Sequence, residues 1–102
     1  MIIRVVPEAR LELGDAADYY EKQQPGLGRR LWQEADEHIL WISLHPDVPR
    51  LRPTGYRRVN LRVFPYYVAY ITRNDVLWVL AIGHSHRRPE YWIERKQKID
   101  LP

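Results

Sequence analysis

The chain has 102 residues, of which 45% are hydrophobic and 28% are charged, a balance typical of a globular domain and too apolar for a disordered chain. It contains no cysteine, which excludes a disulfide framework, a thiolate metal site and a cysteine nucleophile. No apolar run is long enough to cross a membrane, and the N-terminal residues lack the basic start, apolar core and cleavage site of a signal peptide. We therefore expect a single domain over residues 1–102, located in the cytoplasm.

The net charge of +3 conceals an uneven distribution along the chain. Residues 1–49 carry five Lys/Arg against nine Asp/Glu, a balance of −4, whereas residues 50–102 carry eleven against four, a balance of +7. The second half uses nine arginines and two lysines, and arginine is the better residue for bidentate contacts with phosphate or carboxylate. The pattern predicts a basic face, for which polyanions are the commonest partners; an ordinary solvated surface is the alternative.

The N-terminal segment predicts a strand followed by a helix. Ile2 to Val6 is a short β-branched run, which is typical of a strand. The helix begins at Pro7, a residue tolerated at the first helical position, and apolar residues recur at helical spacing as far as Tyr20. Pro25 and Gly26 end it. The acidic residues of this helix lie off the apolar stripe, so we expect them on a solvated face.

A second helix is predicted from about Gly28 to Leu44, where residues 45–49 (HPDVP) stop it. Two helices joined by a short turn form an antiparallel hairpin. Trp32 and Trp41 widen the apolar stripe of the second helix. Together with Trp78 we expect them in the core, because large aromatic residues dominate the cores of small domains.

Three strands follow the hairpin. From Arg57 to Val63 apolar and polar residues alternate, the pattern of a half-exposed strand. The next strand spans roughly Tyr66 to Thr72, and Val76 to Ile82 is apolar throughout, as in a central strand covered on both faces. Connections this short make neighbouring strands antiparallel. Gly83 is expected to let the chain leave the sheet or form a bulge.

The last predicted element is a short helix that begins at Pro89. It contains Tyr91 and Trp92, which should pin it to the sheet. The order is then β-α-α-β-β-β-α. It predicts an α+β fold with two layers, in which an N-terminal strand precedes an antiparallel helical hairpin packed on one face of a mostly antiparallel sheet.

A histidine and arginine cluster, HSHRR at residues 84–88, follows the central strand. The His-x-His spacing places both rings on the same side of an extended chain. A metal site would need a third ligand, and no HExxH motif or carboxylate pair supplies one, so we expect no metal and no cofactor. The histidines are either surface or capping residues, or they serve acid–base chemistry or target binding, since imidazole moves protons near neutral pH.

Metal-free RNA cleavage needs a base at the 2′-hydroxyl, an acid at the leaving oxygen and cations at the phosphate. Side chains of these types are present at His84, His86, Arg62, Arg87 and Arg88. Their convergence in space is a hypothesis.

Arginines also gather on and around the first strand after the hairpin. Arg58 and Arg62 should share a face there. They belong either to a solvated face or to a phosphate- or protein-binding ridge, whose members would be Arg50, Arg52, Arg57, Arg58, Arg62 and Arg87. Tyr66 and Tyr67 point to opposite faces, so at most one of them belongs to such a ridge.

The order of elements, with FPYYVAY at residues 64–70 and AIGHSHRRPEYW at residues 81–92, resembles the RelE/ParE superfamily of bacterial type II toxins, often called plasmid stabilisation proteins. The likeness covers almost the whole chain. It implies a cognate antitoxin that wraps and neutralises the toxin. It also implies one of two activities. RelE-like members are ribosome-dependent, metal-free mRNA endonucleases (mRNA interferases), whereas ParE-like members poison DNA gyrase without a nuclease active site.

The positions within the motifs favour the ParE-like side. Tyr67 stands where RelE-like nucleases have an arginine, and Ser85 stands where they have a second basic residue, although Tyr91 matches the C-terminal tyrosine of some nucleases. We therefore expect a toxin that inhibits growth by binding an essential target, with gyrase favoured. The alternatives are an mRNA endonuclease and a non-toxic binding module of the same fold.

Residue types and this resemblance together give two candidate residue sets. If the protein is an RNase, the catalytic residues are His84, His86, Arg62, Arg87 and Tyr91. The residues expected to bind a target or phosphate are Arg57, Arg58, Arg62, Tyr67, Arg87 and Arg88. The expected partners are the antitoxin and either gyrase or ribosome-bound mRNA, with no membrane; the assembly is a toxin–antitoxin hetero-oligomer or a homodimer.

Overall fold

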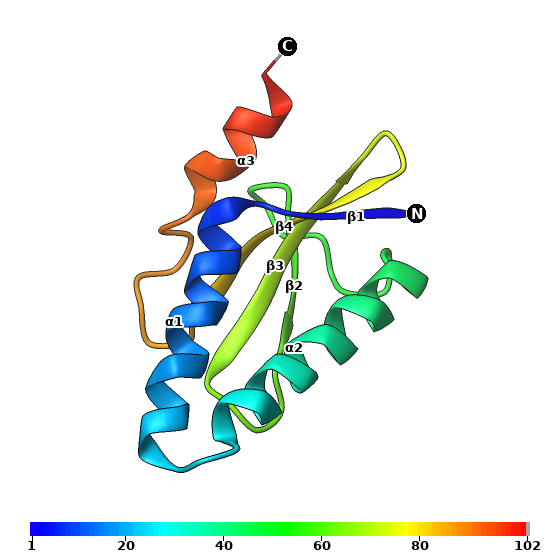
Figure 1. Ribbon diagram of the computed structural model, residues 1–102. Helices are drawn as coiled ribbons and strands as arrows, with labels where there is room; N and C mark the ends of the chain where they lie inside the picture. Colours follow the sequence, from blue (N-terminus) through cyan, green and yellow to red (C-terminus); the bar gives the residue numbers. More distant parts are fainter. Residues whose placement is uncertain (102) are drawn as a thin grey trace.

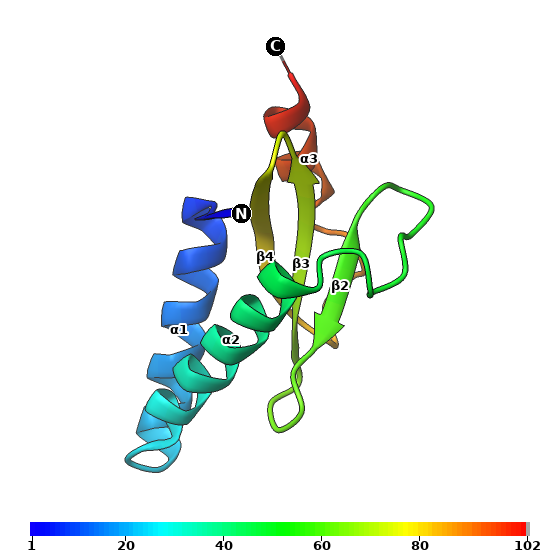
Figure 2. The ribbon, with the colours of Figure 1, turned by 90° about the vertical axis from the view of Figure 1, so that its right-hand side faces the viewer.

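A computed structural model describes residues 1–101 and confirms the predicted α+β arrangement. In chain order (Figure 1) the elements are β1 (Ile2–Val5), α1 (Pro7–Gln23), α2 (Leu27–Leu44), β2 (Arg57–Asn60), β3 (Tyr66–Arg73), β4 (Val76–His84) and α3 (Ile93–Asp100). The strands form one sheet in the order β1-β4-β3-β2, with β1 parallel to β4 and the other pairs antiparallel. Figure 2 shows α1 and α2 together on one side of the sheet. Among the described residues, no helix has both the length and the apolar character needed to cross a membrane.

The turn between α1 and α2 is built for close approach of the two helices. Gly26 adopts a φ of 95°, which favours glycine. A Cβ on Gly28 would lie 2.6 Å from the carbonyl oxygen of Ala17, so only glycine lets the helices come this close. The Glu21 carboxylate accepts hydrogen bonds from the backbone N–H groups of Gly26 and Gly28, which places negative charge at the positive end of α2. The hairpin is therefore fixed by local chemistry as well as by its apolar stripes.

Both faces of β3 and β4 are buried, as the apolar run in β4 predicted. The exit or bulge predicted at Gly83 is wrong, because Gly83 pairs with Tyr67 inside the ladder and the register shift lies at Ala69/Tyr70. A Cβ on Gly83 would lie 2.4 Å from Cζ of Tyr67. Glycine is required here because the Tyr67 ring lies across the strand.

The buried tryptophan is not one of those predicted for the core. Trp32 and Trp41 are 39% and 41% exposed, so their expected place in the core is wrong, and Trp78 is half-buried. The apolar α2 residues that enter the core are instead Leu31, Ala35 and Ile42. Trp92 is 1% exposed and is the large aromatic of the core. It lies just before α3, which begins at Ile93 and not at Pro89.

Candidate functional site

A pocket of about 330 Å³ lies between α1 and the adjoining ends of β3 and β4. We call it the His84 pocket, after the residue that ends β4. The residues that line it are Glu12, Asp15, Ala16, Tyr19, Tyr66, Ile82, His84, Arg87 and Tyr91. It gathers three of the five proposed catalytic residues, namely His84, Arg87 and Tyr91.

The two histidines do come together. Their ring centroids are 5.1 Å apart, and the His84 ring also meets Tyr66 edge to face at 4.9 Å. His86 lies in the turn after β4, and its backbone N–H donates to Nδ1 of His84 at 3.0 Å. Since a backbone N–H only donates, Nδ1 accepts and the neutral ring carries its proton on Nε2. In this arrangement His84 has no free nitrogen with which to accept a substrate proton.

Tyr91 is held as a fixed hydrogen-bond donor. Its hydroxyl donates to Glu12, whose carboxylate also accepts from the backbone N–H of Ile82 at 3.1 Å and forms an ion pair with Arg95 at 2.9 Å. The Arg87 guanidinium lies 3.8 Å from the centroid of the Tyr91 ring. Burial raises the pKa of Tyr91, and the hydrogen bond to Glu12 raises it further. The phenol therefore stays protonated near neutral pH and connects α1 to the segment before α3.

The solvated face predicted for the acidic residues of α1 is wrong for Glu12. Its side chain is mostly buried by Ile82, Tyr91 and Arg95. These partners are 70 or more residues away in the chain, so no local pattern could have revealed them. Asp15 also lines the pocket and is exposed. Two carboxylates, Glu12 and Asp15, thus stand beside two cations, Arg87 and Arg95, and the pocket is not strongly basic.

Arg62 is apart from the other proposed catalytic residues. β2 ends at Asn60, so Arg62 lies in the following turn, where its side chain is 78% exposed. The buried carboxylate of Glu34 holds this turn by accepting from the backbone N–H groups of Arg62 at 3.1 Å and Val63 at 3.2 Å. Arg62 is not among the residues that line the His84 pocket. The five-residue catalytic set is not assembled.

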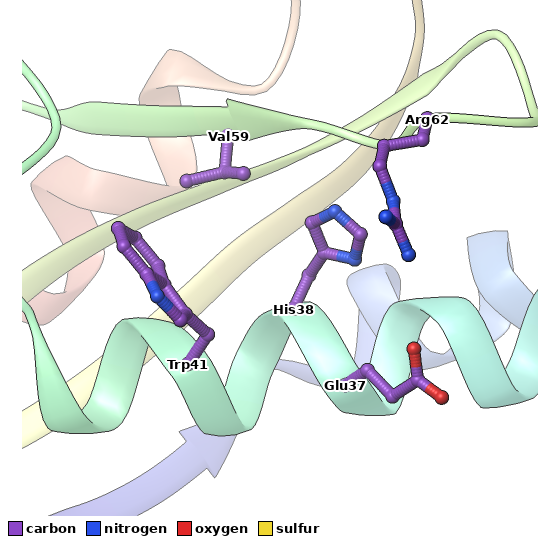
Figure 3. A pocket seen from close by; sticks show the side chains of 5 residues that line it. All are labelled: Glu37, His38, Trp41, Val59 and Arg62. Carbon is purple, nitrogen blue, oxygen red and sulfur yellow. The ribbon is translucent and has the colours of Figure 1, made fainter.

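Arg62 instead lines a second pocket, of about 340 Å³, between α2 and β2. We call it the Trp41 groove. Its lining residues, drawn in Figure 3, are Glu37, His38, Trp41, Val59 and Arg62.

The arginines of β2 do not form one ridge. Arg57 donates to the carbonyl oxygen of Pro49 at 2.6 Å and so holds the loop after α2. Arg58 lies 4.1 Å from the centroid of the Tyr67 ring, on the opposite face from Arg62, which approaches Glu34 of α2. The prediction that Arg58 and Arg62 share a face is wrong because the strand ends between them.

Tyr67 is a core residue. Its side chain is buried, and its hydroxyl accepts a hydrogen bond from Nε1 of Trp92 at 2.8 Å. It therefore offers no surface to a target. Of the other predicted binding residues, Arg87 and Arg88 are exposed in the turn after β4, beside Ser85. In the stretch 1–101, no three His, Asp or Glu side chains gather in a way that could hold a metal ion.

A family model described as the ParE toxin of the type II toxin-antitoxin system, parDE, matches residues 3–89. The chain belongs to the ParE toxin family. A solved structure described as the chromosomal ParDE TA system from P. aeruginosa has the same fold, with a TM-score of 0.72, 17% identity, and coverage of 82% of this chain and 95% of that chain. No curated protein matches the sequence significantly. The resemblance to the RelE/ParE superfamily, on the ParE-like side, is confirmed, and the protein is a toxin of a type II toxin–antitoxin system.

The part of the chain matched to the ParE toxin family ends at residue 89. It contains Glu12, His84 and Arg87 but neither Tyr91 nor Arg95. The two residues that engage Glu12 from the C-terminal segment are thus features of this chain outside the matched region.

Proposed function

We propose that this ParE-family toxin arrests growth by binding DNA gyrase, and that a cognate antitoxin neutralises it by direct binding. The charge balance of the His84 pocket is the observation that favours a protein target over a nucleic acid. A phosphodiester backbone is bound through an excess of cations, whereas here Glu12 and Asp15 offset Arg87 and Arg95.

The composition of the pocket rim also supports a protein target. Tyr19 is 59% exposed at its edge, with Tyr66, His84 and Arg87 beside it. Tyrosine and arginine are enriched among the residues that contribute most to protein–protein binding. A tyrosine with two rotatable side-chain bonds also loses little conformational entropy on binding.

The nuclease alternative rests on the close pair of His84 and His86 beside Arg87. Three observations count against it. Tyr91 is engaged by Glu12, Nδ1 of His84 is occupied by a backbone N–H, and Arg62 lies in another pocket.

Induction of the chain alone in a bacterial host tests the proposal directly. We expect growth arrest with intact mRNA 5′ ends, and loss of supercoiling activity when the purified protein is added to gyrase. New cleavage sites in translated messages, with gyrase unaffected, would refute the protein target.

Substitutions on α1 separate an interface from an active site. Tyr19→Ala should weaken gyrase inhibition by about tenfold or more, as expected of an aromatic anchor. Leu11→Ala is the matched control, since Leu11 is 64% exposed on the same helix but lies outside the His84 pocket. If the protein were a nuclease, by contrast, His84→Ala alone would abolish most of the RNA cleavage, because an acid–base group raises the reaction rate by about 10²–10⁴-fold.

A further inference from the structure

One stripe of α1 forms a wall of the His84 pocket. Tyr66 and His84 line the pocket from the adjoining ends of β3 and β4. The α1 residues that line it recur at three- and four-residue spacing and so share one face of the helix; they are Glu12, Asp15, Ala16 and Tyr19. The pocket thus combines aromatic rings with charged side chains.

The charged residues that line the pocket differ in whether they already have a partner. The Glu12 carboxylate accepts hydrogen bonds from Tyr91 and Arg95. Asp15 is exposed and forms no ion pair within residues 1–101. Arg87 is the one lysine or arginine among the lining residues; it lies over the Tyr91 ring and likewise has no carboxylate partner in this part of the chain. A ligand that enters the pocket therefore meets one unpaired carboxylate and one unpaired guanidinium.

Two tyrosine rings line the same pocket as Asp15. Tyr19 follows Asp15 by one helical turn and is 59% exposed. Tyr66 is half-buried and meets Tyr20 and His84 edge to face. In the described chain, no lysine or arginine lies over either Tyr19 or Tyr66. These rings are therefore available to a cation that the chain itself does not supply.

Arginine is the cation that this fold already places on tyrosine rings. The guanidinium of Arg58 lies 4.1 Å from the centroid of the Tyr67 ring, and that of Arg87 lies 3.8 Å from the centroid of the Tyr91 ring. A planar guanidinium stacks on an aromatic face and donates two N–H groups to one carboxylate, whereas the ammonium of lysine acts as a point charge. Tyrosine rings beside an unpaired carboxylate therefore suit an arginine side chain better than a lysine.

We infer that the His84 pocket receives an arginine side chain of the target protein. The guanidinium stacks on Tyr19 and Tyr66 and pairs with Asp15, while an acidic residue close to that arginine in the target pairs with Arg87. Both unpaired charges of the pocket then gain a partner, so neither is left buried and alone in the complex. A nucleic-acid backbone carries charges of one sign and cannot satisfy both. The inference rests on the proposed protein target, and it specifies the chemistry by which that target is recognised.

Two aspartates of α1 offer a matched pair of substitutions. Asp15 and Asp18 are both exposed, but only Asp15 lines the His84 pocket. Binding of each purified variant to purified bacterial DNA gyrase is measured at low salt, where charge pairs contribute most. We expect Asp15→Asn to weaken binding by about tenfold or more and Asp18→Asn by less than about twofold.

A charge reversal tests the other end of the pocket. Arg87→Glu should weaken gyrase binding by about tenfold or more at low salt, because it repels the acidic residue of the target. Arg10→Glu is the control, since Arg10 is exposed on α1 and lies outside the pocket, and it should bind like the wild type. All of these substitutions change exposed side chains, so the variants should unfold at nearly the wild-type temperature.

A small probe tests the pocket without gyrase. N-acetyl-arginine N-methylamide is titrated into the purified chain while the ring signals of Tyr19 and Tyr66 are followed by NMR. We expect saturable shifts at both rings with a Kd on the order of millimolar, as for a ligand of this size, and loss of these shifts in Asp15→Asn. The citrulline analogue is the control, because it has nearly the same shape and no charge, and it should cause no saturable shift.

The outcomes distinguish this inference from the proposed function. Gyrase that binds the wild type, Asp15→Asn and Arg87→Glu equally overturns the arginine pocket and leaves gyrase as the target. If the wild-type chain does not bind gyrase, the proposed function is overturned and the titration decides the pocket. Shifts caused by the arginine analogue alone then assign the pocket to another protein target, and their absence overturns it. Arginine-specific shifts together with selective loss of gyrase binding in Asp15→Asn and Arg87→Glu support the inference.

Discussion

Replacing Gly83 by alanine disturbs the close packing of the Tyr67 ring against β4. The added Cβ would lie 2.4 Å from Cζ and 2.6 Å from the hydroxyl oxygen of Tyr67. Carbon atoms pack at about 3.5–4.0 Å, so the ring must retreat by about 1 Å. It has no room to do so, because Tyr67 is buried and accepts a hydrogen bond from Trp92, which is itself buried.

Two terms set the expected magnitude. Forcing extra volume into a packed core costs about 1–3 kcal/mol, and loss of the Tyr67–Trp92 hydrogen bond costs about 0.5–1.5 kcal/mol. We expect Gly83→Ala to lower the free energy of unfolding by about 2–4 kcal/mol and Tm by more than about 10 °C. Urea unfolding of the purified chain, followed by tryptophan fluorescence, measures this change. Gly14→Ala is the control, since a Cβ at Gly14 in α1 meets nothing within 4 Å, and it should stabilise by about 0.5–1 kcal/mol.

A double-mutant cycle tests the cause of the effect. Removing the ring with Tyr67→Ala should relieve the clash, so that Gly83→Ala in that background costs less than about 1 kcal/mol. An equal cost in both backgrounds, or a Gly83→Ala variant as stable as the wild type, would refute the packing argument.

Three further predictions concern the buried and paired carboxylates. Glu12→Gln should lower the free energy of unfolding by about 2–3 kcal/mol, because it leaves Arg95 without its ion pair. Thermal unfolding of the variant measures this loss, and a loss below about 0.5 kcal/mol would contradict the role of the ion pair. Glu34→Ala should cost about 1–3 kcal/mol by leaving the turn N–H groups unpaired, and hydrogen exchange should rise at Val63 if the carboxylate fixes this turn. Hydrogen bonds from Arg73, then from Lys96, lower the pKa of Asp100 to about 2, so its contribution is present above the unfolded pKa of about 3.9 and is lost as pH falls through about 2. This pairing is partly exposed, so Asp100→Asn should cost less than about 1 kcal/mol at pH 7, and this cost should shrink as pH falls and vanish only below pH 2. A difference that grows on acidification would contradict the assignment.

The order of elements could be predicted because each element carries its own local signal. Pro7 begins α1, the Pro25 and Gly26 pair separates the helices, and the change of period at Arg57 marks the sheet. Such signals depend on residues a few positions apart, so they survive without knowledge of the fold. The parallel pairing of β1 with β4 carries no such signal, since it joins segments more than 70 residues apart.

The candidate site could be predicted only in part, for a related reason. The clustering of His84, His86 and Arg87 follows from their closeness in sequence. Arg62 shares only a chemical type with them, and the turn held by Glu34 places it in a different pocket.

The succession of helices and strands and the ParE-like motifs of the C-terminal third can be predicted from the amino-acid sequence, because both depend on short-range patterns. Which side chains are available for binding depends on how the chain folds. Tyr67 is buried because Gly83 leaves space for its ring, and Tyr91 is engaged because α1 brings Glu12 to it. Trp41 is exposed because α2 turns Leu31, Ala35 and Ile42 into the core instead. Each outcome depends on volume or charge supplied by a distant segment, and that segment comes near only when the chain is folded.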